Sequence, residues 1–166
     1  NGFIYAGDTP HGRQKRSTAL IDRPGHFEDQ GSYIHVQRFV HDLSVWQHLS
    51  LSEQEQIMGR SREHHLVSPE ENANSHYVRS RVTDLSNPQA QHQLLRQSMP
   101  YADMREQGLF FVSHCQSSAP FKSMLHSMIF GTTVGEYDAF LDYSNAETGG
   151  AYFAPSIDFI KRRAQS

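Results

Sequence analysis

A strict alternation of residue types marks residues 32–41. One face of this segment would carry mainly β-branched side chains and the other mainly aromatic and polar ones: Ile34, Val36, Arg38 and Val40 against Tyr33, His35, Gln37, Phe39 and His41. A period of two with such residues is typical of a β-strand. Apolar runs over residues 94–99, 109–115 and 151–154 predict three more strands, and residues 17–21 are compatible with a short one.

A helical stretch follows the first strand. Asp42 breaks the strand and opens a helix through Trp46. Ser52 and Glu55 have the spacing of a capping box, in which each side chain satisfies a free backbone amide at the start of a helix. Gly59 would end this helix, because glycine readily adopts the left-handed conformation that follows a last helical turn.

A second helix is predicted between the third and fourth strands. Pro120 suits its first turn and Gly131 its end. Between them, apolar residues recur at helical spacing and predict a face that packs into the core: Phe121, Met124, Leu125, Met128 and Ile129. Residues 137–143 predict a short third helix.

The predicted order is strand, helix, strand, strand, helix, strand. This order defines an α+β, ferredoxin-like βαββαβ fold, in which helices cover one face of an antiparallel sheet. The other face is then open, and we expect a second domain, a partner or a cofactor to cover it. Residues 1–30 predict an irregular arm before a domain of residues 31–166, and residues 60–75 predict a long loop, a type of segment that often carries function.

Composition and charge narrow the function classes. The 166 residues fit one domain, or one domain with an arm. The formal net charge of −3 argues against a nucleic-acid partner, and no apolar stretch reaches the roughly 18 residues that a membrane helix needs. The single cysteine, Cys115, excludes a disulfide framework and favours a reducing, cytoplasmic location. The 11 histidines direct attention to metal or haem chemistry.

Four side chains are candidates for chemistry from their type and position. His76 follows the long loop and can ligate haem iron, although a lone histidine is more often a surface or core residue. Arg96 lies inside a predicted strand, where it forms either a salt bridge or a fixed positive charge beside a reacting group. Asp138 and Asp142 are one helical turn apart, and either can orient a histidine or lie on the surface.

Zinc is the competing metal. His64 with His65, or His35 with His41, can supply imidazole ligands for it. The sequence has no second thiol and no HExxH motif, so the indication of zinc is weak.

Several long motifs, taken in order along the chain, resemble those of the bacterial dye-decolourising peroxidases. They are GSY at 31–33, QRFVHDL at 37–43, Trp46, LSEQE at 51–55, IMGR at 57–60, Ser75-His76, LRQSMPY at 95–101, GLFFV at 108–112 and APSIDF at 154–159. The resemblance extends from Gly2 to about Phe159. It implies two ferredoxin-like domains in the whole protein, with haem b held mainly by the C-terminal one, and this chain matches that half.

The resemblance also implies roles for single residues. His76 matches the proximal ligand of the haem iron, and Asp138 matches the carboxylate that holds this histidine, with Asp142 as a rival. The remaining positions match groups around the haem: Arg60 the arginine at a haem propionate, Arg96 the distal arginine, Ser98 a distal asparagine or serine, and Leu109 and Phe111 the apolar residues above the haem.

The distal loop departs from the family. The family reads G-x-x-D-G, whereas residues 2–6 read GFIYA, so that Tyr5 replaces the aspartate and Ala6 the second glycine. Tyrosine is neutral near pH 7. Either a shifted loop brings Asp8 inward, or the protein lacks this acid.

The expected function is that of a haem-dependent peroxidase. It would reduce hydrogen peroxide and oxidise dyes or phenolic compounds, as a homo-oligomer without a nucleic-acid or membrane partner. Such reductants are too large for the pocket, so electrons would travel through aromatic side chains; Tyr77, Trp46, Tyr101 and Tyr143 are candidates, each of which also has a structural explanation. The alternative is a non-catalytic haem-binding or assembly domain, because Tyr5 replaces the distal aspartate.

Overall fold

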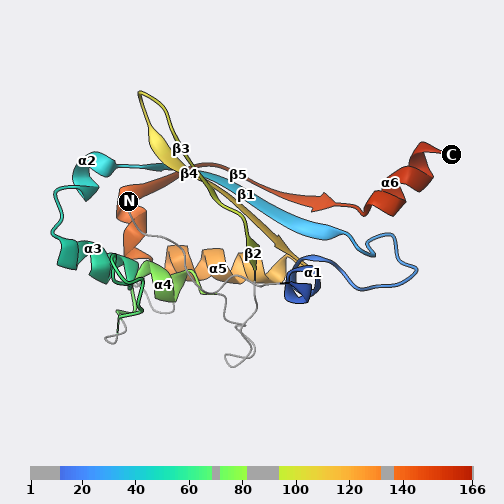
Figure 1. Ribbon diagram of the computed structural model, residues 1–166, viewed down its shortest axis with the longest axis horizontal. Coiled ribbons are helices and arrows are strands. Elements are labelled where there is room, and N and C mark those ends of the chain that lie inside the picture. The colour runs from blue at the N-terminus through green and yellow to red at the C-terminus, as the bar shows by residue number, and fades with distance from the viewer. Residues whose placement is uncertain (1–11, 69–71, 82–93, 132–136, 166) are drawn as a thin grey trace.

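The computed structural model describes residues 12–68, 72–81, 94–131 and 137–165 (Figure 1). Its strands are β1 (Ser32–His41), β2 (Leu95–Arg96), β3 (Met99–Ala102), β4 (Gln107–Cys115) and β5 (Ser144–Ala154). Its helices are α1 (Arg13–Ala19), α2 (Leu43–Trp46), α3 (Leu51–Met58), α4 (His76–Arg79), α5 (Ala119–Phe130) and α6 (Ile157–Ala164), with a 3-10 helix, η1, at Ala139–Tyr143. Among the described residues, no helix combines the length and apolar character needed to cross a membrane.

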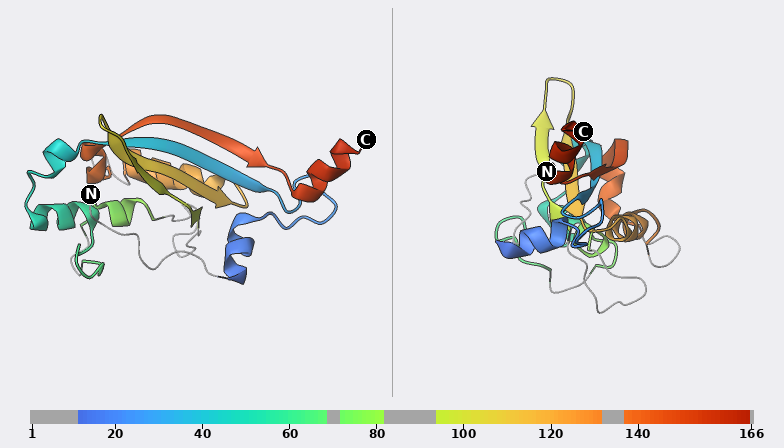
Figure 2. Two further views of the ribbon diagram at one scale, coloured as in Figure 1. Left: turned by 45° about the horizontal axis from the view of Figure 1, so that its top comes forward. Right: turned by 90° about the vertical axis from the view of Figure 1, so that its right-hand side faces the viewer.

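One antiparallel sheet organises these elements. β1 lies in its middle, between β4 and β5, while β2 and β3 both pair with the far side of β4. Helices α1, α3, α4 and α5 lie on one side of the sheet (Figures 1 and 2). The predicted ferredoxin-like class is confirmed, because the strand order β2-β4-β1-β5 is that of a split βαβ fold.

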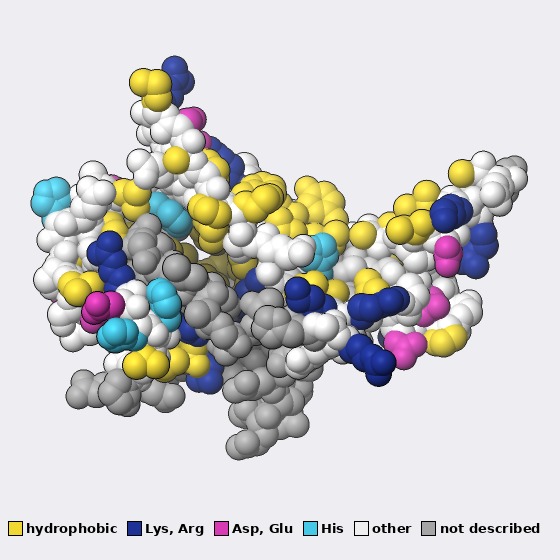
Figure 3. All heavy atoms as spheres, viewed as in Figure 1, with side chains coloured by type: hydrophobic (Ala, Val, Ile, Leu, Met, Phe, Trp, Pro, Cys, Tyr) yellow, Lys and Arg dark blue, Asp and Glu magenta, His cyan; other side chains and the backbone are white. Residues whose placement is uncertain are grey.

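The two faces of β1 differ as its alternation predicted. Gln37 lies opposite Phe111 and Phe39 opposite Leu109, and these side chains face the helices. The aliphatic side chains of β1 therefore face away from the helices, since successive strand residues point to opposite faces. Exposed apolar side chains gather on that outer face and on α6 (Figure 3), among them Phe110 and Tyr152.

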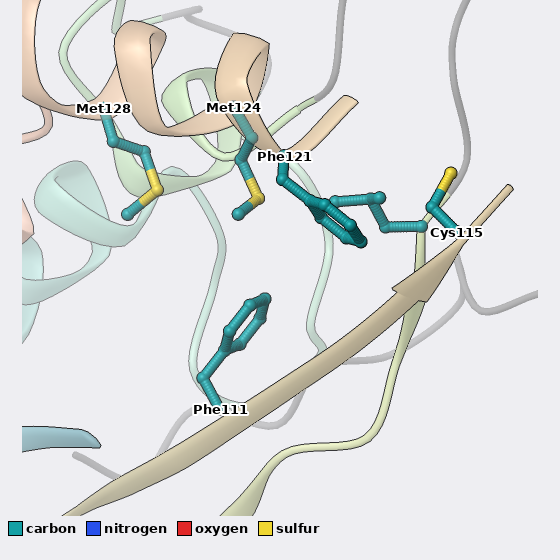
Figure 4. Close-up of a cluster of buried hydrophobic side chains, with 6 residues drawn as sticks. Phe111, Cys115, Phe121, Met124 and Met128 are labelled. Carbon is teal, nitrogen blue, oxygen red and sulfur yellow. The ribbon is translucent and has the colours of Figure 1, made fainter. Parts of the chain in front are cut away.

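The core lies between α5 and β4. Phe121, Met124 and Met128 of α5 pack with Phe111 and Cys115 of β4, and their side chains point toward one another (Figure 4). The predicted apolar face of α5 is confirmed for these three residues. Ile129 was wrongly included, because it lies in the last turn of the helix and is 52% exposed.

Two local predictions near the N-terminal end are wrong. Residues 17–21 do not form a strand: α1 covers Arg13–Ala19, and the chain becomes extended only at Leu20. The residues before Ala19 are mainly good helix formers, and their propensity outweighs the short apolar run that follows. The capping box is formed by Ser50 and Glu53, two residues before the predicted pair.

The position of this cap follows from a tertiary contact. The spacing S-x-x-E occurs twice in succession, so the sequence allows either start. The buried Gln54 donates from Nε2 to the carbonyl oxygens of Trp46 (3.0 Å) and Leu49 (3.3 Å) and thereby fixes the helix against the turn before it. The predicted stop is confirmed, since Gly59 is the C-cap of α3 in the left-handed region (φ 70°).

The lengths of three predicted elements also differ. The strand predicted over residues 94–99 is divided, because only Leu95–Arg96 pairs before the chain pairs again at Met99–Ala102. The last strand is longer than predicted and begins at Ser144, directly after η1, which occupies the end of the predicted helix at 137–143. Residues such as Asn145 and Glu147 gave no apolar run, because β5 lies at an edge of the sheet and is largely exposed.

Two phenylalanines on α5 test the position of the core. Phe121 is 5% exposed and Phe130 is 64% exposed on the same helix. We expect Phe121→Ala to lower the free energy of unfolding by about 3–5 kcal/mol, because it leaves a cavity against β4. Phe130→Ala should change it by only about 0.5 kcal/mol. Urea denaturation measures both, and equal losses would contradict this placement of the core.

Candidate functional site

A cavity of about 820 Å³ lies between the inner face of the sheet and the helices beneath it. This volume is within the range of roughly 300–1,000 Å³ that is usual for cofactor and ligand sites. Apolar side chains form much of its wall: Phe39, Leu43, Leu109, Phe111, Met124, Met128 and Phe140. The cavity is thus on the helix side of the sheet.

Most of the predicted site residues meet around this cavity. Arg60, His76, Arg96, Ser98, Leu109 and Phe111 line it, and they come from four separate parts of the chain. Asp138, the remaining predicted residue, is fully buried beside His76. The structure therefore brings the predicted set together at one place.

His76 is presented to the cavity by a capped helix. It is the first residue of α4, whose N-cap is Ser75; the Ser75 hydroxyl accepts a hydrogen bond from the backbone N–H of Val78 at 3.4 Å. His76 donates from Nδ1 to Oδ2 of Asp138 at 2.7 Å. Since the carboxylate accepts, Nδ1 carries a proton, and in the neutral imidazole Nε2 then has a lone pair for a ligand.

The Asp138 carboxylate is fixed by the fold. Its Oδ1 accepts from the backbone N–H of Phe140 at 3.0 Å, so the side chain caps η1 while it holds His76. The Asp138 N–H donates to the carbonyl of Met128 at 2.8 Å, which ties this residue to the end of α5. A buried carboxylate with both oxygens bonded in this way has little freedom to turn.

Asp142, the predicted rival, has another partner. It is exposed and accepts from the Tyr137 hydroxyl at 2.9 Å. This contact raises the pKa of the Tyr137 phenol. The structure thus pairs His76 with Asp138 and not with Asp142, a choice that the sequence left open. Glu136, which lies near them in the sequence, is outside the described residues.

Two arginines bring positive charge to the cavity wall. Arg96 extends from β2, and its Nη2 donates to the carbonyl of Ser80 at the end of α4 and lies 3.6 Å from Sδ of Met124. Arg60 is buried, with its guanidinium 4.4 Å from the centre of the Tyr77 ring. Guanidinium groups remain charged at all ordinary pH values, so the cavity suits a ligand that carries negative charge at its edge.

His41 belongs to the site but was not among the predicted site residues. It lines the cavity, and its Nδ1 lies 2.9 Å from Oγ of Ser144. Burial lowers the pKa of His41 to about 4, so this imidazole is neutral at pH 7. The alternation of β1 could have revealed it, because it places His41 on the same face as Phe39.

Two further hypotheses from the sequence concern a zinc site and the distal loop. Among the described residues, no three histidine, cysteine or acidic side chains are grouped as a metal site would require, and His35 stacks on Phe121 instead of meeting His41. Tyr5, Ala6 and Asp8 of the distal loop lie outside the described residues.

The fold and the site define an α+β domain in which a histidine–aspartate pair faces an apolar cavity with positive charge at its wall. Residues 1–159 match the family described as Dyp-type peroxidase, C-terminal. The chain therefore belongs to the dye-decolourising peroxidase family.

Related proteins agree with this assignment. The chain is 32% identical to a dye-decolorizing peroxidase of Mycobacterium tuberculosis, over 96% of this chain and 48% of that protein, and 33% identical to one of Rhodococcus erythropolis, over 96% and 47%. It therefore spans about half the length of these relatives.

Solved structures show the same arrangement. A putative dyp-type peroxidase protein from Shewanella oneidensis superposes with a TM-score of 0.90 at 39% identity, over 97% of this chain and 52% of the other. A variant of DypB from Rhodococcus jostii RHA1 in complex with heme superposes with a TM-score of 0.87 at 32% identity, over 96% and 52%.

Gly59 tests how α4 is positioned. A Cβ added at Gly59 would lie 2.6 Å from Oγ of Ser75, the N-cap of the helix that starts with His76. Gly25 also has a positive φ (83°), but no atom lies within 4 Å of its added Cβ. We expect Gly25→Ala to cost about 1–2 kcal/mol of unfolding free energy from its backbone conformation, and Gly59→Ala to cost about 1–3 kcal/mol more from overpacking. Urea denaturation of the two variants measures the difference in unfolding free energy. Equal losses would show that α4 shifts to accommodate the added methyl group without further loss of stability.

Proposed function

We propose that this chain forms the haem-holding half of a peroxidase that reduces hydrogen peroxide and oxidises phenolic or dye-like aromatic compounds. The observation that carries this proposal is the His76–Asp138 hydrogen bond beside the apolar cavity. An imidazole whose other ring nitrogen donates to a carboxylate is the usual form of a protein ligand to iron. The R. jostii relative in complex with heme supports the same cofactor class.

The residues present fit haem b. Its ring system is flat and apolar and carries two carboxylates, and the cavity combines apolar walls with two arginines. His76 would hold the iron through Nε2, Arg60 would bind a propionate, and Leu109 and Phe111 would supply apolar contacts to the ring. Burial of the Arg60 guanidinium is reasonable only if it faces a negative charge or an aromatic ring, and Tyr77 supplies the latter in this structure.

The chain itself supplies positioning and electrostatics. Haem, when bound, would supply the redox chemistry that takes up hydrogen peroxide. Asp138 keeps the His76 ring in one orientation and increases its basicity, which strengthens a bond from Nε2. Arg96 places a permanent positive charge at the cavity wall, where it would stabilise negative charge that develops as the O–O bond breaks. Ser98 would hold the peroxide by a hydrogen bond.

The wider organisation is also a proposal. Residues 31–166 would form the haem-holding domain and residues 1–30 an arm over its distal side. We further propose a homo-oligomer in the cytoplasm, where the buried thiol of Cys115 stays reduced; burial raises its pKa and so disfavours the reactive thiolate.

A second function has one observation in its favour. Tyr5 stands where the family has an aspartate, and a neutral phenol cannot accept the peroxide proton near pH 7. Haem binding without turnover, as in a non-catalytic haem-binding or assembly domain, is the outcome that this substitution would produce. Peroxide-dependent oxidation of a dye by the haem-loaded protein separates the two functions.

Haem binding has a built-in reporter. The chain has one tryptophan, Trp46, whose ring contacts Phe140, and the Phe140 ring in turn contacts that of His76. Titration with hemin should quench the Trp46 fluorescence as a Soret band develops. His76→Ala should abolish the Soret band, and Asp138→Asn should weaken haem affinity by about 10–100-fold. Asp142→Asn is the matched control and should bind haem as the unmodified chain does; equal effects of the two aspartates would reject the assigned pair.

Arg96 tests the catalytic half of the proposal. Arg96→Leu should leave the hemin-dependent Soret band in place but slow the reaction with hydrogen peroxide by about 10²–10³-fold, since one stabilising charge is removed. Stopped-flow spectroscopy of the haem-loaded protein measures this rate. Arg62→Leu, at an exposed position, is the control. An unchanged rate for Arg96→Leu would remove this residue from the mechanism.

A further inference from the structure

A continuous line of aromatic rings connects His76 with the surface. The ring of Phe140 lies 5.3 Å from that of His76, measured between ring centres. Trp46 lies 5.4 Å from Phe140 on its other side, at an interplanar angle of 85°. Tyr143 follows at 5.3 Å from Trp46. These separations are those of rings in direct contact.

The line ends where a large molecule can reach it. The indole of Trp46 is 3% exposed and cannot meet a bulky reductant directly. Tyr143 is partly exposed and is the last residue of η1. The site that a reductant can touch is therefore the phenol.

We propose that Tyr143 is the site at which bulky aromatic reductants give up electrons, with Trp46 as the relay toward His76. This inference rests on the proposed function, because the electrons need the peroxide-reducing centre as their destination. Tyr143 is not one of the residues that line the cavity, so a reductant at its phenol would not compete with peroxide for the same space. Phe140 is not oxidised itself, but its packed ring keeps the gap between His76 and Trp46 free of solvent.

The fold holds these rings rigidly. The carbonyl of Tyr143 accepts from the backbone N–H of Asp42, the N-cap of α2, at 2.9 Å. The carbonyl of Trp46 accepts from Nε2 of the buried Gln54 at 3.0 Å. Asp138, which holds His76, also caps the helix that contains Phe140. Electron transfer between aromatic groups becomes slower with distance, so fixed ring contacts favour this route.

The positive charge close to the ring distinguishes Tyr77 and Tyr101 from Tyr143. The Tyr77 ring lies between two guanidinium groups, with Arg60 at 4.4 Å and Arg81 at 4.7 Å from its centre. Arg38 lies 5.2 Å from the centre of the Tyr101 ring. A cation over a ring opposes removal of an electron from it, because the charge that stabilised the π-system then faces a positive hole.

The proton of the phenol adds to this difference. The Tyr101 hydroxyl donates to the carbonyl of Phe39 at 3.0 Å, and a carbonyl cannot take up the proton that an oxidised phenol releases. Among the described residues, no guanidinium lies over the ring of Tyr143, and its partial exposure allows the proton to pass to water. Of Tyr77, Tyr101 and Tyr143, we therefore expect Tyr143 to be the most readily oxidised.

The step balances as a one-electron exchange. Tyr143 loses one electron through Trp46 toward the peroxide-reducing centre and releases its phenolic proton to water. A phenolic reductant then transfers one electron and one proton to the Tyr143 phenoxyl radical, which restores tyrosine and leaves a substrate phenoxyl radical. Two such cycles supply the two electrons that, with two protons, reduce one hydrogen peroxide to two waters.

The relay can be tested in the haem-free protein. Because Trp46 is the only tryptophan, a UV laser pulse at a wavelength that tyrosine does not absorb creates one indolyl radical at a known place. We expect its absorbance to decay as that of a tyrosyl radical rises, in the unmodified chain and in Tyr77→Phe and Tyr101→Phe. In Tyr143→Phe the rise should be lost. If the transfer is absent from the unmodified chain, or survives in Tyr143→Phe, the relay is overturned.

A second measurement tests Tyr143 as the oxidation site. The haem-loaded chain is treated with hydrogen peroxide and a nitroso spin trap, and the adduct is located by peptide mass spectrometry. We expect the adduct on Tyr143 and its loss in Tyr143→Phe but not in Tyr77→Phe. An adduct only on other residues would overturn the assignment. If hemin gives no Soret band, the proposed function and the oxidation site fail together, whereas the laser experiment still reports on the ring contacts alone.

Discussion

The hydrogen bond from Nδ1 of His76 to Oδ2 of Asp138 is the interaction on which the site depends. It joins residues 62 positions apart, and one partner is a carboxylate with no exposed surface. A buried carboxylate is costly unless it is hydrogen-bonded, so Asp138 requires both the Phe140 amide and the imidazole. Asp138 can reach the His76 imidazole only when η1 packs beside α4. The hydrogen bond therefore fixes the position of His76 at the cavity wall.

The cavity is lined from two layers of the fold. His76 comes from α4 in the helix layer, whereas Arg96 comes from β2 of the sheet and reaches the end of α4 at Ser80. The packing of the helices on the sheet therefore brings these two side chains to one cavity. Apolar contacts between α5 and β4 hold the two layers together.

Aromatic contacts around Phe140 extend the site beyond the cavity. Phe140 contacts His76 on one side and Trp46 on the other, and His41 lies beside it as a neutral imidazole. The capped 3-10 helix thus has two roles: Asp138 at its start orients the histidine, and the residues that follow place aromatic rings between that histidine and the surface. A short, rigid element suits both roles, because each depends on a fixed distance.

The sequence by itself determined the elements whose signals are local. The alternation of residues 32–41 gave β1 with its correct bounds and faces, the helical stripe gave α5, and the order of elements gave the fold class. The motifs also located the residues that line the cavity, because each motif belongs to one short segment. Tertiary structure alone decided the choices between local equivalents. Only packing against Trp46 selects Ser50 over Ser52 as the helix cap, and only the approach of η1 to α4 selects Asp138 over Asp142, since a sequence pattern fixes spacing along the chain but not distance through space.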